Sequence, residues 1–305
     1  MIQWIIETIS LPFRNQWALE NIVNGLKSLF TGGGARGFVA TCMLITEMFG
    51  MLLAGNPVSP WGQNLDLTGY ELVYEDEFET ETLNLDEWYV RSPGKRNGGF
   101  NSSSQLSLKD GNLVLTGEYK EDGAYGSGWY GAFIALKKHY LRGYFEIRCK
   151  CAASDAFWSA FWLQGIKSPY NAETSKGGIE SCEIDIFEAM GYNTNKHNAV
   201  TQTIHCAGVG GETEGYQSRI LGFFKGEDIY NEYNTYGVEW TEKEYIFYVN
   251  GVETTRSSFG DGVCINPEEV IVSLCIPSAE KLREKDKNEK CEMLVDYVRI
   301  YQLAE

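Results

Sequence analysis

Short segments of alternating polarity fill the chain from Tyr70 onward, and they constrain its fold more than any other feature. Apolar and polar residues alternate with a period of two, as in half-buried strands, and Gly, Asn and Asp separate the segments. The clearest segments are ELVYEDEF, GNLVLTGEY, YFEIRCKC, AVTQTIHC, EYIFYVNG, EVIVSLC and MLVDYVRIY. No helical pattern is sustained, and no strand–helix–strand alternation indicates a parallel sheet. The pattern predicts an all-β, antiparallel sandwich of roughly 230 residues.

Residues 1–65 differ from the rest and are predicted to form a hydrophobic N-terminal segment, with the β domain spanning 66–305. Within this segment, residues 38–54 form an apolar run with a single acidic residue, close to the lower length limit of about 17 residues for a membrane span. We favour a signal sequence that ends near Ala54, with Arg36 as its basic flank, which predicts a secreted or cell-surface protein. The alternatives are a membrane anchor and a pair of helices packed on the domain.

Charge and composition limit the partners of the chain. The formal net charge is −16, the isoelectric point is about 4.7, and no block of basic residues occurs. A nucleic acid backbone or an anionic membrane surface is therefore not an expected partner. The 33 Gly, 18 Tyr and 8 Trp, against only 7 Pro, favour a β-protein that handles carbohydrate. We expect a monomer.

The eight cysteines lack the CxxC and Cys/His spacing of zinc-binding motifs. The sequence therefore predicts no metal site built on such a motif. The cysteines are Cys42, Cys149, Cys151, Cys182, Cys206, Cys264, Cys275 and Cys291. We expect most of them to be buried free thiols, with one or two disulfides as the alternative.

One predicted strand, residues 183–188 (EIDIFE), holds three carboxylates among apolar residues. Because the burial of uncompensated carboxylates is costly, such a strand indicates a site of chemistry. Side chains alternate along a strand, so Glu183 and Asp185 share one face while the isoleucines face the core. A β-bulge at Ile186-Phe187 would return Glu188 to the face of the other two acids.

This row of acids suits glycoside hydrolysis, which needs one carboxylate beside the anomeric carbon and one protonated carboxyl beside the glycosidic oxygen. Three neighbouring acids repel one another, so at neutral pH we expect them to hold one proton among them as a coupled system. A solvated acidic strand face and a divalent metal site are the alternatives.

The acidic strand resembles that of glycoside hydrolase family 16, whose endo-glycanases carry the signature E-[hydrophobic]-D-x-x-E on a bulged strand. Five other segments resemble strands of the family and follow in the same order. They are YEDEF (74–78), YFEIR (144–148), FWSAFWL (157–163), YGVEW (236–240) and VDYVRIY (295–301). The resemblance covers residues 70 to 302.

The resemblance implies a concanavalin A-like β-jelly-roll of two curved antiparallel sheets with a concave substrate cleft, and a retaining double displacement. By position, Glu183 matches the nucleophile, Glu188 the acid and then base, and Asp185 the residue that assists the nucleophile. Trp162 matches a wall residue near the cleaved sugar. Trp158 is the weaker candidate for substrate binding, because it suits the core equally well.

Two further residues are implied by the resemblance alone. Asn101, in GGFN, resembles the Asn of the family's G-W-G-N loop, which faces the cleft and binds substrate. Asp296 matches a residue beside a structural calcium on the convex side. No cofactor is expected to be required for catalysis.

His205 and Trp129 are candidates for substrate binding on other grounds. The segment 199–206 is expected to return antiparallel beside the acidic strand, which sets His205 opposite Glu183. A structural histidine is the alternative, but the family often has His at this point, so we favour a cleft role. Trp129 lies in GSGWYG, a predicted flexible turn that presents an indole to a sugar face, with a cap over the core as the alternative.

We therefore expect an endo-acting O-glycosyl hydrolase, with a 1,3- or 1,3/1,4-β-glucan as its polysaccharide substrate. Many β-glucanases of the family carry Trp shortly before the first Glu, whereas residues 179–182 here are IESC. Residues 167–178 also form an insertion. An endo-β-galactosidase acting on a β-galactan is thus the alternative enzyme, and a non-catalytic sugar-binding jelly-roll is the alternative function.

Overall fold

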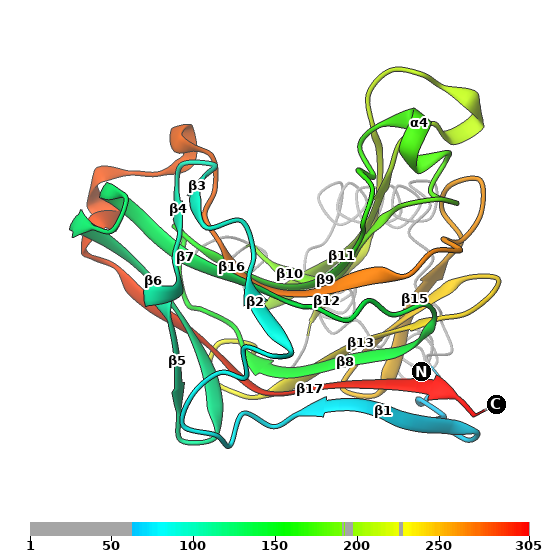
Figure 1. Ribbon diagram of the computed structural model, residues 1–305, viewed down its shortest axis with the longest axis horizontal. Coiled ribbons are helices and arrows are strands. Elements are labelled where there is room, and N and C mark those ends of the chain that lie inside the picture. Colours follow the sequence, from blue (N-terminus) through cyan, green and yellow to red (C-terminus); the bar gives the residue numbers. More distant parts are fainter. Residues whose placement is uncertain (1–62, 191, 193–197, 226–227, 305) are drawn as a thin grey trace, which may run out of the picture.

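The computed structural model describes residues 63–190, 192, 198–225 and 228–304 of the chain. Strands are the main regular secondary structure of these residues, as the alternating pattern predicts (Figure 1). The α-helix α4 (Ala172–Ser175) is one turn long, and the remaining helical pieces are 3-10 turns: η1 (Ser103–Gln105), η2 (Val209–Gly211), η3 (Ala279–Lys281) and η4 (Glu284–Asn288). Within the described ranges, no helix has the length and apolarity to cross a membrane. Residues 1–62, which hold nearly all of the predicted N-terminal segment 1–65 and its apolar run 38–54, lie outside these ranges.

One sheet lines the concave side of the molecule. Its order is β12–β11–β10–β9–β16–β7–β2, with each strand antiparallel to the next. The strands are β2 (Trp88–Val90), β7 (Gly126–Leu136), β9 (Trp158–Gly165), β10 (Glu183–Ala189), β11 (Ala199–Cys206), β12 (Gln217–Lys225) and β16 (Glu268–Cys275). In Figure 1 this layer curves upward at both sides, toward the β3–β4 arm and toward the arm that carries α4.

The second sheet packs beneath the first. Its order is β15–β14–β13–β8–β17, and the outer edge of β17 pairs with β6 in its first half and with β1 in its second. β6 also pairs with β5 and with the first half of β7, so β7 passes from this sheet into the concave one. These strands are β1 (Tyr70–Asp76), β5 (Leu106–Lys109), β6 (Asn112–Gly123), β8 (Gly143–Lys150), β13 (Asn234–Trp240), β14 (Tyr245–Val249), β15 (Val252–Ser257) and β17 (Lys290–Leu303).

A short hairpin, β3 (Gly94–Arg96) and β4 (Gly99–Asn101), joins the edge of β7. The β4–β7 contact is the one parallel pairing among the described strands. The remaining pairings are antiparallel, and the two packed sheets form the predicted jelly-roll.

Two tight hairpins show how the sequence sets the strand register. Asp110 and Gly111 join β5 to β6 with φ of 52° and 70°, and Asn250 and Gly251 join β14 to β15 with φ of 51° and 70°. Two successive residues at positive φ form a type I′ turn, for which Asp-Gly and Asn-Gly are the preferred pairs.

The main core lies between the two sheets. Ile184, Ile186 and Phe187 of β10 are buried in it, and the Phe187 ring stacks on Tyr236 of β13 with 4.2 Å between ring centroids. The apolar residues of the acidic strand therefore face the core, as predicted. All seven cysteines in the described ranges are buried free thiols, also as expected, whereas Cys42 lies outside these ranges.

Candidate active site

β10 places three carboxylates on the concave face. Its register against β11 shifts between Asp185 and Glu188, and its register against β9 shifts between Asp185 and Phe187. This is the predicted β-bulge, in which one extra residue turns Glu188 back to the side of the other acids. His205 lies directly opposite Glu183 on β11, also as predicted.

Glu183 is 8% exposed and is held by two hydrogen-bond donors. The Gln164 amide and the Tyr170 hydroxyl both donate to Glu183 Oε2. Gln164 comes from the neighbouring strand β9, and Tyr170 comes from the loop that precedes α4. Gln164 is itself fixed, because its Oε1 accepts a hydrogen bond from Arg91, whose Nε lies 2.6 Å from Glu269 Oε2. The Glu183 carboxylate thus has one fixed orientation.

Asp185 lies between the two glutamates and is nearly fully buried. Burial raises its pKa well above the usual range, and the charge of Glu183 raises it further. His205 Nε2 lies 3.0 Å from Asp185 Oδ2 and 4.0 Å from Glu183 Oε1. The shorter contact is not an aligned hydrogen bond, since Asp185 Oδ2 has no hydrogen-bond partner among the described residues. On its other side, His205 Nδ1 lies 2.6 Å from Ser218 Oγ, which fixes the ring.

Glu188 has the environment of a proton donor. Burial raises its pKa to about 8, the charge of Asp185 adds to the effect, and His205 opposes it. The carboxyl therefore carries its proton at neutral pH, which is the state that a general acid needs. Glu183 and Glu188 thus differ in surroundings: two donors anchor Glu183, whereas the environment of Glu188 raises its pKa.

Two tryptophans of β9 lie on the same face as the acids. Trp162 pairs with Asp185 across the β9–β10 ladder, and its Nε1 donates to Ser273 Oγ at 3.0 Å. Trp158 is partly buried against the same apolar floor, and it lies close enough to Glu188 to lower the pKa of that carboxyl. This floor is formed by Phe133, Ala135, Ala160, Trp162, Ile271 and Cys275. It is separate from the main core, so the fold places Trp158 on the cleft side.

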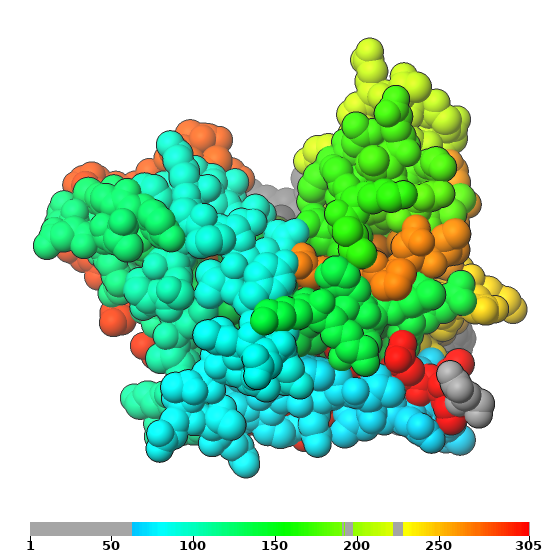
Figure 2. Space-filling model, in the orientation of Figure 1, coloured from blue at the N-terminus to red at the C-terminus, as the bar shows by residue number. Residues whose placement is uncertain are grey.

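The concave face continues as a hollow beyond the acids. Figure 2 shows the upper edge of the molecule hollowed between the cyan β3–β4 arm and the green arm that carries α4. A pocket of about 620 Å³ lies next to Glu183 and is lined in part by Tyr89, Arg91, His139, Gln164 and Tyr170. Two cations border the apolar floor: the Arg91 guanidinium lies 5.2 Å from the centre of the Trp162 ring, and that of Arg96 lies 4.5 Å from the centre of the Phe133 ring.

The prediction that Trp129 binds substrate is wrong. Trp129 is 7% exposed and packs in the main core, with its ring centroid 6.1 Å from that of Phe157 and 5.2 Å from that of Tyr119. Its GSGWYG segment is the start of β7 rather than a flexible turn. The glycines there allow close packing instead, since a Cβ at Gly128 would lie 2.8 Å from the Phe100 ring.

The prediction that Asn101 faces the cleft is also wrong. Asn101 is fully buried, because the parallel pairing of β4 with β7 draws it inside, and its Nδ2 donates to the Ser92 carbonyl at 3.3 Å. Asp296 pairs with Arg148 on the second sheet. It belongs to neither of the two groups of His, Cys, Asp and Glu that gather ligand atoms within the described ranges. The calcium at Asp296 stays a prediction.

Three contacts of the site were not anticipated from the sequence: Gln164, Tyr170 and Arg91. The position of Gln164 could have been predicted from the sequence. It lies two residues beyond Trp162 and therefore on the same face of β9. Tyr170 lies in the insertion 167–178, for which no strand pattern sets a position. Arg91 lies far from Glu183 in sequence and reaches it only through Gln164.

An antiparallel jelly-roll with a bulged acidic strand on its concave face defines the class of protein, a glycan-hydrolase fold. Residues 72–303 match the family model described as β-porphyranase A-D, GH16 domain. The chain therefore belongs to glycoside hydrolase family 16.

Curated relatives and solved structures agree with this assignment. The chain is 24% identical over 225 residues to the endo-1,3-1,4-β-glycanase ExsH of Rhizobium meliloti, which covers 71% of this chain and 43% of that protein. It is 26% identical over 257 residues to a keratan-sulfate endo-1,4-β-galactosidase of Sphingobacterium multivorum, covering 77% of this chain and 56% of the relative. The laminarinase catalytic domain of Thermotoga maritima shares the fold, with a TM-score of 0.59, 20% identity, and coverage of 77% of this chain and 99% of that domain. The chain spans less than two thirds of the length of either curated relative.

Proposed function

We propose that this protein is an endo-acting, retaining O-glycosyl hydrolase that cleaves a β-linked polysaccharide. One observation carries the proposal: the bulge in β10 sets an anchored carboxylate, Glu183, and a protonated carboxyl, Glu188, on one face of a cleft. These are the two groups that a glycosidase needs.

In the first step, Glu183 attacks the anomeric carbon while Glu188 gives its proton to the departing glycosidic oxygen, which leaves a glycosyl ester on Glu183. In the second step, Glu188 takes a proton from water, the water oxygen bonds to the anomeric carbon, and the ester bond to Glu183 breaks. Once Glu183 is esterified it carries no charge, so it no longer raises the pKa of Glu188. The same carboxyl is therefore a better base in the second step than in the first.

Asp185 and His205 adjust the two glutamates in this proposal. Asp185 is the neighbour whose charge most raises the pKa of Glu188, and His205 limits that effect. Trp158 is partly exposed and supplies flat apolar surface for a sugar ring beside the acids, whereas Trp162, which is 5% exposed, forms the floor against which Trp158 packs. The pocket next to Glu183 offers room for further sugars along the chain, which supports cleavage inside a polymer.

The substrate we propose is a 1,3- or 1,3/1,4-β-glucan. Curated relatives named as endo-1,3-1,4-β-glycanases and a glucan endo-1,3-β-glucosidase support it. We further propose that the protein meets this polymer outside the cell, as a secreted or cell-surface monomer.

The second candidate substrate is a β-galactan that carries negative charge. The lack of a counter-charge for Arg96, in the part of the chain that the structure describes, favours it. Within the described residues Arg96 makes no ion pair, and its Nε has no hydrogen-bond partner. A neutral glucan offers no counter-charge to this guanidinium, whereas a sulfated sugar does. The matched porphyranase model and the relative that acts on keratan sulfate point to the same candidate.

The test is incubation of the protein with laminarin, mixed-linkage glucan, agarose, keratan sulfate and mucin-type glycans, followed by sizing of the products. We expect oligosaccharides of several lengths from laminarin or mixed-linkage glucan, and none with Glu183→Gln. Products from keratan sulfate alone would favour the charged galactan, whereas products from agarose alone would favour a galactan but contradict the role argued for Arg96. Folded protein that binds a glycan without cleaving any would favour the sugar-binding alternative.

A further inference from the structure

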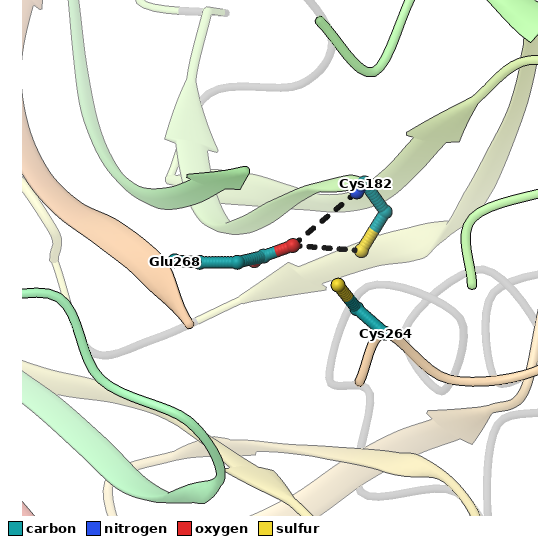
Figure 3. A group of neighbouring side chains, drawn as sticks. All are labelled: Cys182, Cys264 and Glu268. Carbon is teal, nitrogen blue, oxygen red and sulfur yellow. Dashed lines mark hydrogen bonds between the residues drawn. The ribbon is translucent and has the colours of Figure 1, made fainter. Parts of the chain in front are cut away.

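On the core side of the acidic strand, two thiols and a carboxyl meet. Cys182 immediately precedes Glu183, Cys264 lies in the loop between β15 and β16, and Glu268 begins β16. Figure 3 shows the Glu268 carboxyl and the two sulfur atoms turned toward one another. One ligand atom from each of the three side chains lies within 4.8 Å of the others.

The contacts within this cluster are specific. Glu268 Oε1 accepts from the backbone N–H of Cys182 and from its thiol, both at 3.3 Å. The Tyr245 hydroxyl lies 3.3 Å from Cys182 Sγ and accepts from the backbone N–H of Cys264 at 2.8 Å. Two sulfurs and a carboxylate oxygen thus lie within reach of one ion, with the Tyr245 hydroxyl beside Cys182 Sγ.

The cluster is fully enclosed and lacks a counter-charge. Glu268 and Cys264 are 0% exposed, and Cys182 is 1% exposed. Glu268 Oε2 has no hydrogen-bond partner, and no Lys, Arg or His of the described residues pairs with this carboxyl. A buried carboxyl with an unsatisfied oxygen is costly in either protonation state. A cation bound between the carboxyl and the sulfurs removes that cost.

We propose that Cys182, Cys264 and Glu268 bind Zn²⁺, with the Tyr245 hydroxyl as the fourth donor. Two thiolates and two oxygens form a donor set that zinc accepts, because zinc takes both sulfur and oxygen ligands in tetrahedral sites. Sulfur and oxygen ligands of one tetrahedral zinc lie roughly 3.5 Å apart, given the usual bond lengths. The 3.3 Å separations of Cys182 Sγ from Glu268 Oε1 and from the Tyr245 hydroxyl are close to this value.

Binding requires loss of the thiol protons and of any proton on Glu268, and these pass to solvent. The bound ion would tie the start of β10 to the start of β16 directly behind Glu183. Its role would be to stabilise the fold, since the cluster lies on the face of β10 opposite the carboxylates that act on sugar.

The test uses the full chain, purified under reducing conditions and loaded with Zn²⁺, and needs no activity assay. We expect one zinc per chain after gel filtration in a weak chelator, and a melting temperature several degrees higher than that of the metal-free protein. Loading with Co²⁺ should produce a thiolate-to-metal charge-transfer band. Cys264→Ser and Glu268→Gln should each lose the tightly held zinc, whereas Cys291→Ser, a buried thiol on β17, should retain it.

Glu268→Gln keeps both thiols and the size of the side chain, so it tests the site even where a serine variant fails to fold. Wild-type protein that is folded by circular dichroism but holds no more zinc than Glu268→Gln overturns the proposal. So does a Co²⁺ spectrum without a thiolate band. A Cys182–Cys264 disulfide in protein purified without reductant, together with no zinc uptake after its reduction, also overturns it.

Discussion

The two faces of β10 carry ionisable clusters that begin one residue apart. Glu183 and Asp185 face the cleft, whereas Cys182 faces the core with Cys264 and Glu268. Burial raises the pKa of a carboxyl on both faces, that of Glu188 on the cleft side and that of Glu268 on the core side. The difference lies in access, because the first cluster opens onto a hollow and the second is sealed between the sheets.

Desolvation of a carboxyl therefore does not by itself indicate a catalytic role. On the cleft face, an acid that holds its proton at neutral pH can give it to a substrate. On the core face no substrate can reach the carboxyl, so the same perturbation calls for a bound cation or lowers the stability of the fold. Perturbed acids become catalytic only where the fold also provides an approach.

The largest expected effect is at Glu183. Glu183→Gln removes the nucleophile but keeps the size and the hydrogen-bonding capacity of the side chain, so polysaccharide turnover should fall by about a thousandfold or more. Initial rates on the best glycan, with circular dichroism as a check of folding, measure this. Wild-type-like turnover would end the mechanism proposed for the cleft face.

Glu188→Ala should lower polysaccharide turnover by about a hundredfold to ten-thousandfold, because the leaving sugar then departs without a proton. Aryl glycosides with good leaving groups do not need that proton and should still form the glycosyl-enzyme. Steady-state rates on both substrate types in parallel provide the measurement. If Glu183→Gln kept the aryl glycoside activity and Glu188→Ala lost it, the two roles would be reversed.

The pH dependence of kcat/KM tests whether Glu188 acts as the acid. Its pKa is raised to about 8, so the active, protonated form dominates below this pH and is lost above it. We expect kcat/KM to fall by about tenfold per pH unit once the pH passes 8. With an activated aryl glycoside, Glu188→Ala should lack this basic limb. A limb that persists in that variant would assign the titration to another group.

The smallest expected effects separate the two faces through a matched pair of tryptophans. Trp129→Phe should lower stability by about 1–2 kcal/mol and leave kcat/KM unchanged, because Trp129 packs in the main core. Trp162→Phe should lower kcat/KM by several-fold, because it removes part of the cleft floor beside Asp185 and the hydrogen bond to Ser273 that fixes it. Thermal melts and kinetics of both variants test the assignment, and it would fail if Trp129→Phe changed kcat/KM more than Trp162→Phe.

Local alternation was enough to predict much of the cleft. The alternation of side chains along residues 183–188 predicted which residues face the core, which acids face the cleft, and where the β-bulge lies. The expected antiparallel pairing of the next strand placed His205 opposite Glu183. These are relations between neighbours on one strand or on adjacent strands, which a period of two determines.

The alternation of side chains along a strand did not predict the position of Trp129. Trp129 and Phe133 are four residues apart on β7 and have the same parity, yet Phe133 lies on the concave floor and Trp129 in the core. The strand changes sheet between them, so parity counted along it no longer indicates one face. Tyr170 and the Cys182–Glu268 cluster were also beyond prediction, because loops and long-range pairings position them.

The passage of β7 between sheets has a mechanical consequence. Layers that share a continuous strand cannot slide past each other as separately packed layers do, so shear between the sheets is restrained. We therefore expect the floor of the cleft to keep one width whether or not a sugar chain occupies it. Adaptation to a particular glycan then falls to the connecting loops, such as the segment that brings Tyr170 to Glu183.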